Sequence, residues 1–533
     1  MSPDRKRQRL LFLGLAVLTV GGCARRPPSE PRELRIAIEE TLESLDPATD
    51  SLNAWAVLGN VFEPLVAQGA DLRIEPALAV GWATPEETLW SFELRPGVTF
   101  HDGTPLSPAR VVAGIERVRN DLGSSARSWL ASVASIEAAS PFHVLVRTRG
   151  PDPLLLYHLA QVPIALGKDP REVTAHPVGT GPYRVAGRAD GGLSVEAFPG
   201  WWGPAPKVRR ARFVPLPESA GVAEALTRGR IDLAKVPLVA GGPASFPFPT
   251  EEVRGLSTMF LWIKNLGRAA ENPLADVRVR RALTLALDRR AIAARATGRP
   301  DSAARQLVPA AMFGYQPELV PEATDIAAAR LLLASAGYAG GVTLDLAFRE
   351  TPLARLTAEA VAADLEKAGV RAHLRAVSYE ESLRPTREII RGLFVGFWAF
   401  DVPDASSFLS DCVRTRDLGL SRGLMNQGFS SPRMDDLIDR AAALNDAASR
   451  LDMVRNAFLL ANEEVPVVPL FEVVRIWGHA RDIAYRPRAD ERIVLTEIAY
   501  RATSAFRAPA GTGGGDSGGR ARPSPPPSGS RPR

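Results

Sequence analysis

Short apolar strands and amphipathic helices alternate along most of the chain, from about residue 34 to about residue 500. Residues 34–38 and 89–94 alternate apolar and polar positions with period two, which predicts two strands. Ser107 and Pro108 then supply an N-cap and a first-turn proline, so a helix is expected to begin there.

The central region repeats this alternation more clearly. Residues 277–297, rich in Ala, Leu and Arg, predict one helix ended by Gly298. A strand over 342–348, a helix over 353–368 and a strand over 372–377 form a β-α-β unit. Such a unit implies two parallel strands and therefore an α/β lobe.

Two other segments have distinctive composition. Residues 393–400 are apolar almost throughout, which is typical of a strand buried on both faces. Residues 506–533 consist mainly of Gly, Pro, Ser and Arg, with little apolar surface to offset the entropy of ordering. We expect this tail to be disordered.

The first residues resemble an export signal. Basic side chains precede the eleven-residue apolar run 10–20, which is shorter than the ~20 residues that span a bilayer. The run ends in Val-Gly-Gly-Cys, which resembles a bacterial lipobox with Cys23 as the acylated residue. We therefore expect a signal peptide over 1–22 and a lipid-anchored tether over 23–33. An ordinary secretory peptide with an incidental cysteine is the alternative.

Charge and length exclude some classes of protein. The chain has 533 residues, more than one hydrophobic core usually organises. Its pI is about 9.4, but residues 1–30 carry a net charge of +4 and residues 501–533 carry +5. The body, residues 31–500, therefore carries −4, and no nucleic-acid partner is expected.

Catalytic and metal-binding motifs are missing from the sequence. No zinc-protease, phosphate-loop or C-x-x-C pattern occurs, and the six histidines are scattered. We therefore expect no enzyme activity, no cofactor and no metal site, although the fold could still bring distant histidines together. With Cys23 lipidated, Cys412 has no disulfide partner and is expected to be buried.

Several collinear motifs resemble the solute-binding proteins of ABC importers, in the family of dipeptide-, oligopeptide- and nickel-binding receptors. The most specific is W-S-F-E-L-R-P-G-V-T-F-H-D-G-T-P-L at 90–106. V-F-E-P-L at 61–65 precedes it, and G-T-G-P-Y at 179–183 and P-V-V-P at 466–469 follow. The resemblance extends from about Leu34 to Tyr500.

This resemblance implies an α/β, two-lobed periplasmic-binding-protein fold with a hinge (type II, large cluster C). Lobe I would comprise 34–255 and 471–505, with an extra subdomain at about 50–176, and lobe II would comprise 256–470. The family's ligand is enclosed as the lobes close, and its partners are the transmembrane subunits of an ABC permease. The resemblance also implies a monomer in the bacterial cell envelope, anchored to the membrane and facing the periplasm or the exterior.

Aligned with the family, Asp401 matches an aspartate that binds the α-amino group of a peptide. Trp398 would then pack against the ligand, and Asp404 is a weaker candidate for the same role. An acid after a buried strand lies where α/β folds place ligands. The alternative is that Asp401 caps a turn before Pro403 and Trp398 belongs to the core.

Arg349 is the candidate for the peptide carboxylate, because a guanidinium can bind a carboxylate through two hydrogen bonds. It could instead be a solvated side chain paired with Glu350 or Glu359. Gly181, in the motif that borders the family's hinge, could offer a backbone contact. His101, Trp90 and Phe100 are expected to be mainly structural.

Peptides, as di- or oligopeptides, are therefore the expected cargo. The same fold could instead bind a metal chelate, haem, an opine or a sugar, because the cleft decides the ligand. A lipid-anchored sensor or adaptor is the third hypothesis.

Overall fold

The computed structural model describes residues 32–49, 51–216, 221–237, 246–264, 272–378, 381, 392–417, 422–426 and 428–501. The predicted signal peptide, Cys23 and the tail over 506–533 lie outside these residues, as does most of the tether. Within them, no helix is long and apolar enough to cross a membrane.

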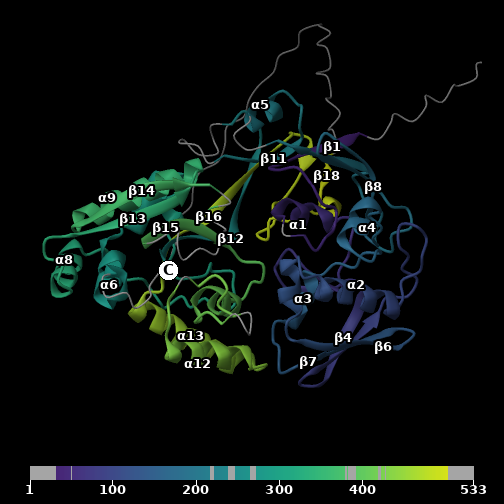
Figure 1. The fold of residues 1–533 in the computed structure, drawn as a ribbon. Helices are drawn as coiled ribbons and strands as arrows, with labels where there is room; N and C mark the ends of the chain where they lie inside the picture. Colours follow the sequence, from purple (N-terminus) through teal and green to yellow (C-terminus); the bar gives the residue numbers. More distant parts are fainter. Residues whose placement is uncertain are drawn as a thin grey trace, which may run out of the picture.

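The largest sheet of the described structure is mixed, has ten strands and extends from β14 to β8 (Figure 1). Its strand order is β14-β13-β15-β12-β16-β11-β1-β10-β9-β8. The strands are β1 (Glu33–Ile38), β8 (Tyr183–Ala189), β9 (Gly192–Ala197), β10 (Arg210–Pro215), β11 (Leu233–Val236), β12 (Thr250–Lys264), β13 (Val342–Arg349), β14 (Val370–Val377), β15 (Gly392–Ala399) and β16 (Val467–His479).

Two long strands, β12 and β16, connect the two halves of this sheet. They pair antiparallel, with a register shift between Arg254 and Thr258. One large core packs around β12, β13 and β15, and a second packs around β1, β9 and β10. The predicted lobe boundaries, at 255/256 and 470/471, fall inside β12 and β16 and stay predictions.

The half with β13–β15 contains the predicted β-α-β unit. Strand β13, helix α9 (Pro352–Lys367) and strand β14 follow in order, and β13 pairs in parallel with both β14 and β15. The parallel prediction is confirmed. The other helices of this half are α6 (Val277–Ala286), α7 (Arg289–Thr297), α8 (Ile326–Ser335), α11 (Ala405–Phe408), α12 (Pro432–Ala442) and α13 (Ala447–Glu464).

The single helix predicted over 277–297 is wrong, because the structure has two. Leu287 is extended, with φ −93° and ψ 119°, and Asp288 caps the new helix by accepting a hydrogen bond from the Ala291 N–H at 3.0 Å. The apolar pattern continues across this break, so periodicity does not reveal it. Gly298, in the left-handed conformation, ends α7 as predicted.

The other half carries a separate four-stranded sheet with its own core. This sheet has the order β4-β5-β7-β6, and Figure 1 shows it beside α2 and α3. The elements of this half are α1 (Leu52–Leu58), β2 (Val66–Gln68), β3 (Ile74–Pro76), β4 (Ala79–Glu86), β5 (Leu89–Leu94), α2 (Pro108–Asn120), β6 (Val133–Ser140), β7 (His143–Thr148), α3 (Leu155–Ala160), α4 (Pro170–Ala175), α5 (Val222–Thr227), β17 (Ile483–Ala484) and β18 (Ala499–Tyr500).

Two of the sequence motifs meet through His101. The Gly179 N–H donates to His101 Nδ1 at 3.3 Å, and His101 Nε2 donates to the Gly181 carbonyl at 3.0 Å. Burial lowers the pKa of His101, which favours the neutral ring that this bonding pattern requires. His101 is therefore a structural residue, as expected.

We predict that Gly181→Ala destabilises this junction by about 1–3 kcal/mol. A Cβ at Gly181 would lie 2.7 Å from the Asn60 carbonyl oxygen, a backbone atom that cannot easily move away. Gly187→Ala is the matched control, since its Cβ would meet nothing within 4 Å. Chemical unfolding of both variants measures the difference, and equal stability would contradict the steric argument.

Candidate ligand-binding site

Asp401 lies just beyond the end of β15. The Phe400 N–H donates to the Leu256 carbonyl at 2.7 Å, and Gln161 Nε2 donates to the Asp401 main-chain oxygen at 3.1 Å. Among the described residues, nothing forms a hydrogen bond or ion pair with the Asp401 carboxylate. Its side chain is exposed to solvent, although neighbouring protein atoms displace part of its hydration shell. Loss of hydration raises its pKa to about 6, against the opposing effect of Arg492.

An aromatic wall leads up to Asp401. Trp398 is half-buried, and its ring centroid lies 6.2 Å from that of Phe408 and 6.4 Å from that of Trp262. Phe408 belongs to α11 and is fully buried, so it supports Trp398 from within the core. Residues 397–399 are half-exposed, which corrects the prediction of a strand buried on both faces along its whole length.

The end of β15 also has an unpaired edge. Strand β13 pairs with β15 only as far as Phe348 opposite Val395, whereas β12 follows β15 to Ala399. In the part of the chain that the structure describes, no strand covers residues 397–399 on the β13 side. Such an edge presents backbone donors and acceptors that an extended peptide can pair with.

Asp404 is occupied inside the protein. Its carboxylate pairs with Arg450 at 2.8 Å and accepts the Ser406 N–H at 2.8 Å, which caps α11. Both charged side chains are buried. This arrangement supports a structural role for Asp404 rather than contact with a ligand.

Arg349 is the last residue of β13 and is half-exposed. Because Phe348 lies opposite Val395, Arg349 is level with Gly396, five residues before Asp401. With a rise of ~3.3 Å per residue, this corresponds to at most about 16 Å, because Asp401 lies two residues beyond the end of β15. The ends of a dipeptide span only ~7 Å, so Arg349 suits the carboxylate of a longer ligand.

Gly181 has both of its backbone groups engaged. Its N–H donates to the Val61 carbonyl at 2.9 Å, and its carbonyl accepts from His101. The structure thus places Gly181 in a tight internal contact and does not bring it together with Asp401.

Three residues near Asp401 were not predicted from the sequence. Gln161, which ends α3, accepts hydrogen bonds from Trp55 Nε1 at 2.9 Å and from Arg492 Nη2 at 2.7 Å. The Arg492 guanidinium lies over the Trp55 ring, 4.6 Å from its centroid. These residues come from distant parts of the chain, so no local pattern could have grouped them.

A second carboxylate, Asp411, lies near the first. It is half-buried, burial raises its pKa to about 6, and both His158 and Asp401 affect that pKa. His158 belongs to α3, so Asp411 faces the smaller sheet's subdomain. No cluster of three or more potential metal-ligating side chains occurs among the described residues.

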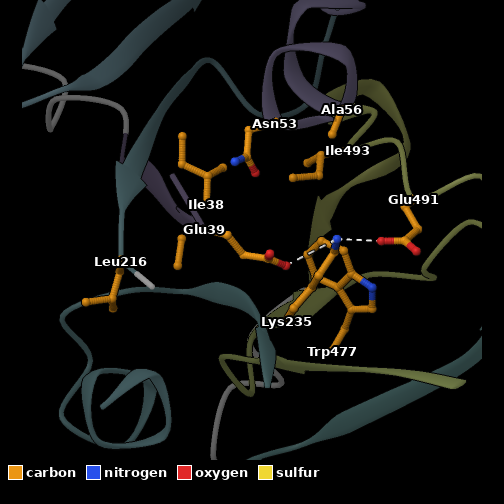
Figure 2. Close-up of a pocket in the computed structure, with 10 residues that line it drawn as sticks. Ile38, Glu39, Asn53, Ala56, Leu216, Lys235, Trp477, Glu491 and Ile493 are labelled. Atoms are coloured by element: carbon orange, nitrogen blue, oxygen red, sulfur yellow. Dashed lines mark hydrogen bonds and ion pairs between the residues drawn. The ribbon is translucent and has the colours of Figure 1, made fainter. Parts of the chain in front are cut away.

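Figure 2 shows a pocket in the half that contains β1. It lies at the carboxyl ends of β1, β10 and β11, where open α/β sheets place ligands. It is open to solvent, and the space between its walls and mouth amounts to about 390 Å³. Its lining is mainly apolar: Ala37, Ile38, Glu39, Asn53, Ala56, Leu216, Lys235, Trp477, Glu491 and Ile493.

Ion pairs hold the wall of this pocket in place. Lys235 Nζ lies 2.5 Å from Glu491 and 3.6 Å from Glu39, and Arg475 binds Glu491 at 3.0 Å. Burial opposes ionisation of Glu491, but Arg475 and Lys235 outweigh it and lower its pKa to about 2. The segment that carries Arg492 is therefore fixed on one side by Glu491.

Comparison with known proteins identifies the architecture. Residues 73–418 match the family described as "Bacterial extracellular solute-binding proteins, family 5 Middle". The glutathione-binding protein GsiB of Escherichia coli O1:K1 / APEC is 25% identical over 508 residues, which cover 90% of this chain and 95% of GsiB.

Solved structures share the fold. The periplasmic binding protein DppA from Helicobacter pylori, in complex with the peptide STSA, has a TM-score of 0.74 at 22% identity and covers 88% of this chain and 98% of its own. AgaA from A. tumefaciens R10, in complex with agropinic acid, has a TM-score of 0.73 at 23% identity, with coverages of 88% and 99%. Structures with this two-lobed fold confirm the predicted fold class.

Proposed function

The chain belongs to the bacterial extracellular solute-binding proteins of family 5, and from this premise we propose that it captures peptides for an ABC importer. Members of the family bind peptides or related solutes outside the cytoplasm and pass them to a permease. They are receptors, not enzymes. Beyond membership of the family, we propose that the ligand is a peptide and that Cys23 carries a lipid anchor.

The free Asp401 carboxylate at the end of an aromatic strand carries this proposal. A peptide ammonium enclosed between the lobes needs a negative charge beside it. Asp401 can supply that charge, because no cationic side chain among the described residues forms an ion pair with it. Trp398 would pack against the ligand, and the open edge of β15 would pair with its backbone. For longer peptides Arg349 would bind the carboxylate. GsiB and DppA, with glutathione and a peptide as their ligands, support this class of cargo.

Native mass spectrometry of the purified protein tests the proposal. The protein is examined first as isolated and then with a library of dipeptides to pentapeptides. We expect a mass increase equal to one peptide per chain, with a length preference that reports on Arg349. A co-purifying metal chelate, or an opine such as the agropinic acid bound by AgaA, with no peptide binding would contradict peptide specificity.

A further inference from the structure

Arg492 is a half-buried cation that forms few hydrogen bonds. A guanidinium carries five N–H donors, and among the described residues Gln161 alone accepts a hydrogen bond from this one. Its Nε is out of contact with water and has no hydrogen-bond partner in the described part of the chain. Burial lowers the pKa of Arg492, which reflects the cost of holding the charge there. Among the described residues, no carboxylate forms an ion pair with this guanidinium, so a bound anion would compensate its charge.

Asp401 and Arg492 are neighbours that do not touch. Each shifts the pKa of the other, yet no hydrogen bond or ion pair joins the two side chains in the described structure. The amide of Gln161 contacts both residues, through Oε1 to Arg492 and through Nε2 to the Asp401 carbonyl. Two oppositely charged side chains that form no ion pair among the described residues are therefore neighbours, and the Gln161 amide links the residues that carry them.

The position of Arg492 is fixed before any ligand arrives. Its backbone N–H donates to Asp490 Oδ1 at 3.2 Å, and Asp490 forms a buried ion pair with Arg488 at 2.7 Å. On the other side, the Ile493 N–H donates to the Ala56 carbonyl at 2.9 Å. A preorganised guanidinium of this kind loses little freedom when it binds a planar anion.

We propose that Asp401 and Arg492 together bind a free amino-acid head group, in which the ammonium and a carboxylate are attached to the same carbon. This inference rests on the proposed function and narrows its ligand class. Asp401 binds the ammonium, and the Arg492 fork binds the adjacent carboxylate. The ligands that fit best are peptides and amino-acid derivatives linked through a side chain, because their α-carboxylate stays free.

An ordinary α-linked peptide satisfies this pair less well. Its first α-carboxyl group is part of the peptide bond, so Arg492 meets a neutral carbonyl oxygen. A guanidinium and a carboxylate form an ion pair that is frequently bidentate, whereas a neutral carbonyl oxygen brings no opposite charge and only one acceptor atom. Arg349, which lies level with Gly396, cannot replace Arg492 at this carbon.

Two isomeric dipeptides test the proposal by calorimetric titration. γ-Glutamyl-alanine has a free α-carboxylate beside its ammonium, whereas α-glutamyl-alanine has the same composition and net charge but no such group. We expect the wild-type protein to bind the γ isomer about 10- to 100-fold more tightly. Arg492→Gln should abolish this preference by weakening the γ isomer alone, and Arg492→Lys should retain part of it.

Several outcomes would overturn the inference. In the wild type, equal affinities for the two isomers would overturn it, and so would failure of the γ isomer to bind. In a folded Arg492→Gln protein, an equal loss of affinity for both isomers would also overturn it. If that variant does not fold, Arg492→Lys and the wild-type preference decide the matter. If α-linked library peptides still bind through Asp401, the proposed function stands even when the inference about Arg492 fails. If no library peptide binds, the proposed function itself is contradicted.

Discussion

Asp401→Asn is expected to lower peptide affinity by about 30-fold to several thousand-fold, because it removes the charge that meets the ligand ammonium. This corresponds to ~2–5 kcal/mol, the usual cost of truncating one partner of an enclosed charge pair. The substitution keeps the size and shape of the side chain. Calorimetric titration with a peptide found by native mass spectrometry measures the change.

The ligand-free stability of the same variant should move the other way. The folded pKa of Asp401, about 6, lies above the ordinary value of 3.8, so the protonated form is favoured in the fold. Its contribution to stability is therefore present at acid pH and is lost as the pH rises through about 6. A neutral Asn avoids this loss, and Asp401→Asn should unfold at the same or a higher temperature at neutral pH.

Asp436→Asn is the control for Asp401→Asn. Asp436 lies on the solvent side of α12 in the same half of the protein, with an exposed carboxylate near Arg440. Its removal should leave affinity unchanged. An Asp401→Asn protein that is folded and binds peptide as tightly as the wild type would refute the assignment of the ammonium to Asp401.

The pH dependence of binding provides a separate test. Affinity should fall by about tenfold per pH unit as the pH drops below about 6, because Asp401 takes up a proton there. Asp411, whose pKa is also about 6, and His158 face the same region. Asp411→Asn should therefore retain the fall, whereas Asp401→Asn should flatten it. A profile that is unchanged in Asp401→Asn would contradict the prediction.

Local patterns in the sequence predicted the elements whose conformation depends only on residues close together in the sequence. Strand β5 and the unit of β13, α9 and β14 follow from periodicity, since alternation and capping residues lie within each segment. The break between α6 and α7 was missed because the apolar pattern continues through Leu287. There a single aspartate, Asp288, and not the hydrophobic pattern determines where the first helix ends and the second begins.

The candidate site could be predicted only in part, because its charges are balanced over long distances in the chain. Asp401 and Asp404 are both aspartates in the same loop. What distinguishes them is Arg450, 46 residues further on, which neutralises Asp404 and leaves Asp401 free. Gln161 and Arg492 are 331 residues apart, and only the fold brings them together.

The buried pair of Asp404 and Arg450 should make a large contribution to stability. Arg450→Met is expected to destabilise the protein by about 3–5 kcal/mol, because it leaves the Asp404 charge buried and unpaired. Arg450 also lies over the Phe313 ring, 4.1 Å from its centroid, so the substitution removes a cation–π contact as well. Chemical unfolding followed by tryptophan fluorescence measures the loss.

Two companion variants separate the cost of an unpaired charge from the cost of lost packing. Asp404→Asn combined with Arg450→Met should recover part of the stability, since no buried charge then remains, although the cap of α11 is weakened. Arg228→Met, which removes a pair between exposed side chains at the C-terminal end of α5, should change stability by less than ~1 kcal/mol. If Arg450→Met were no more destabilising than Arg228→Met, Asp404 would not depend on Arg450 for compensation, and the argument that separates Asp404 from Asp401 would fail.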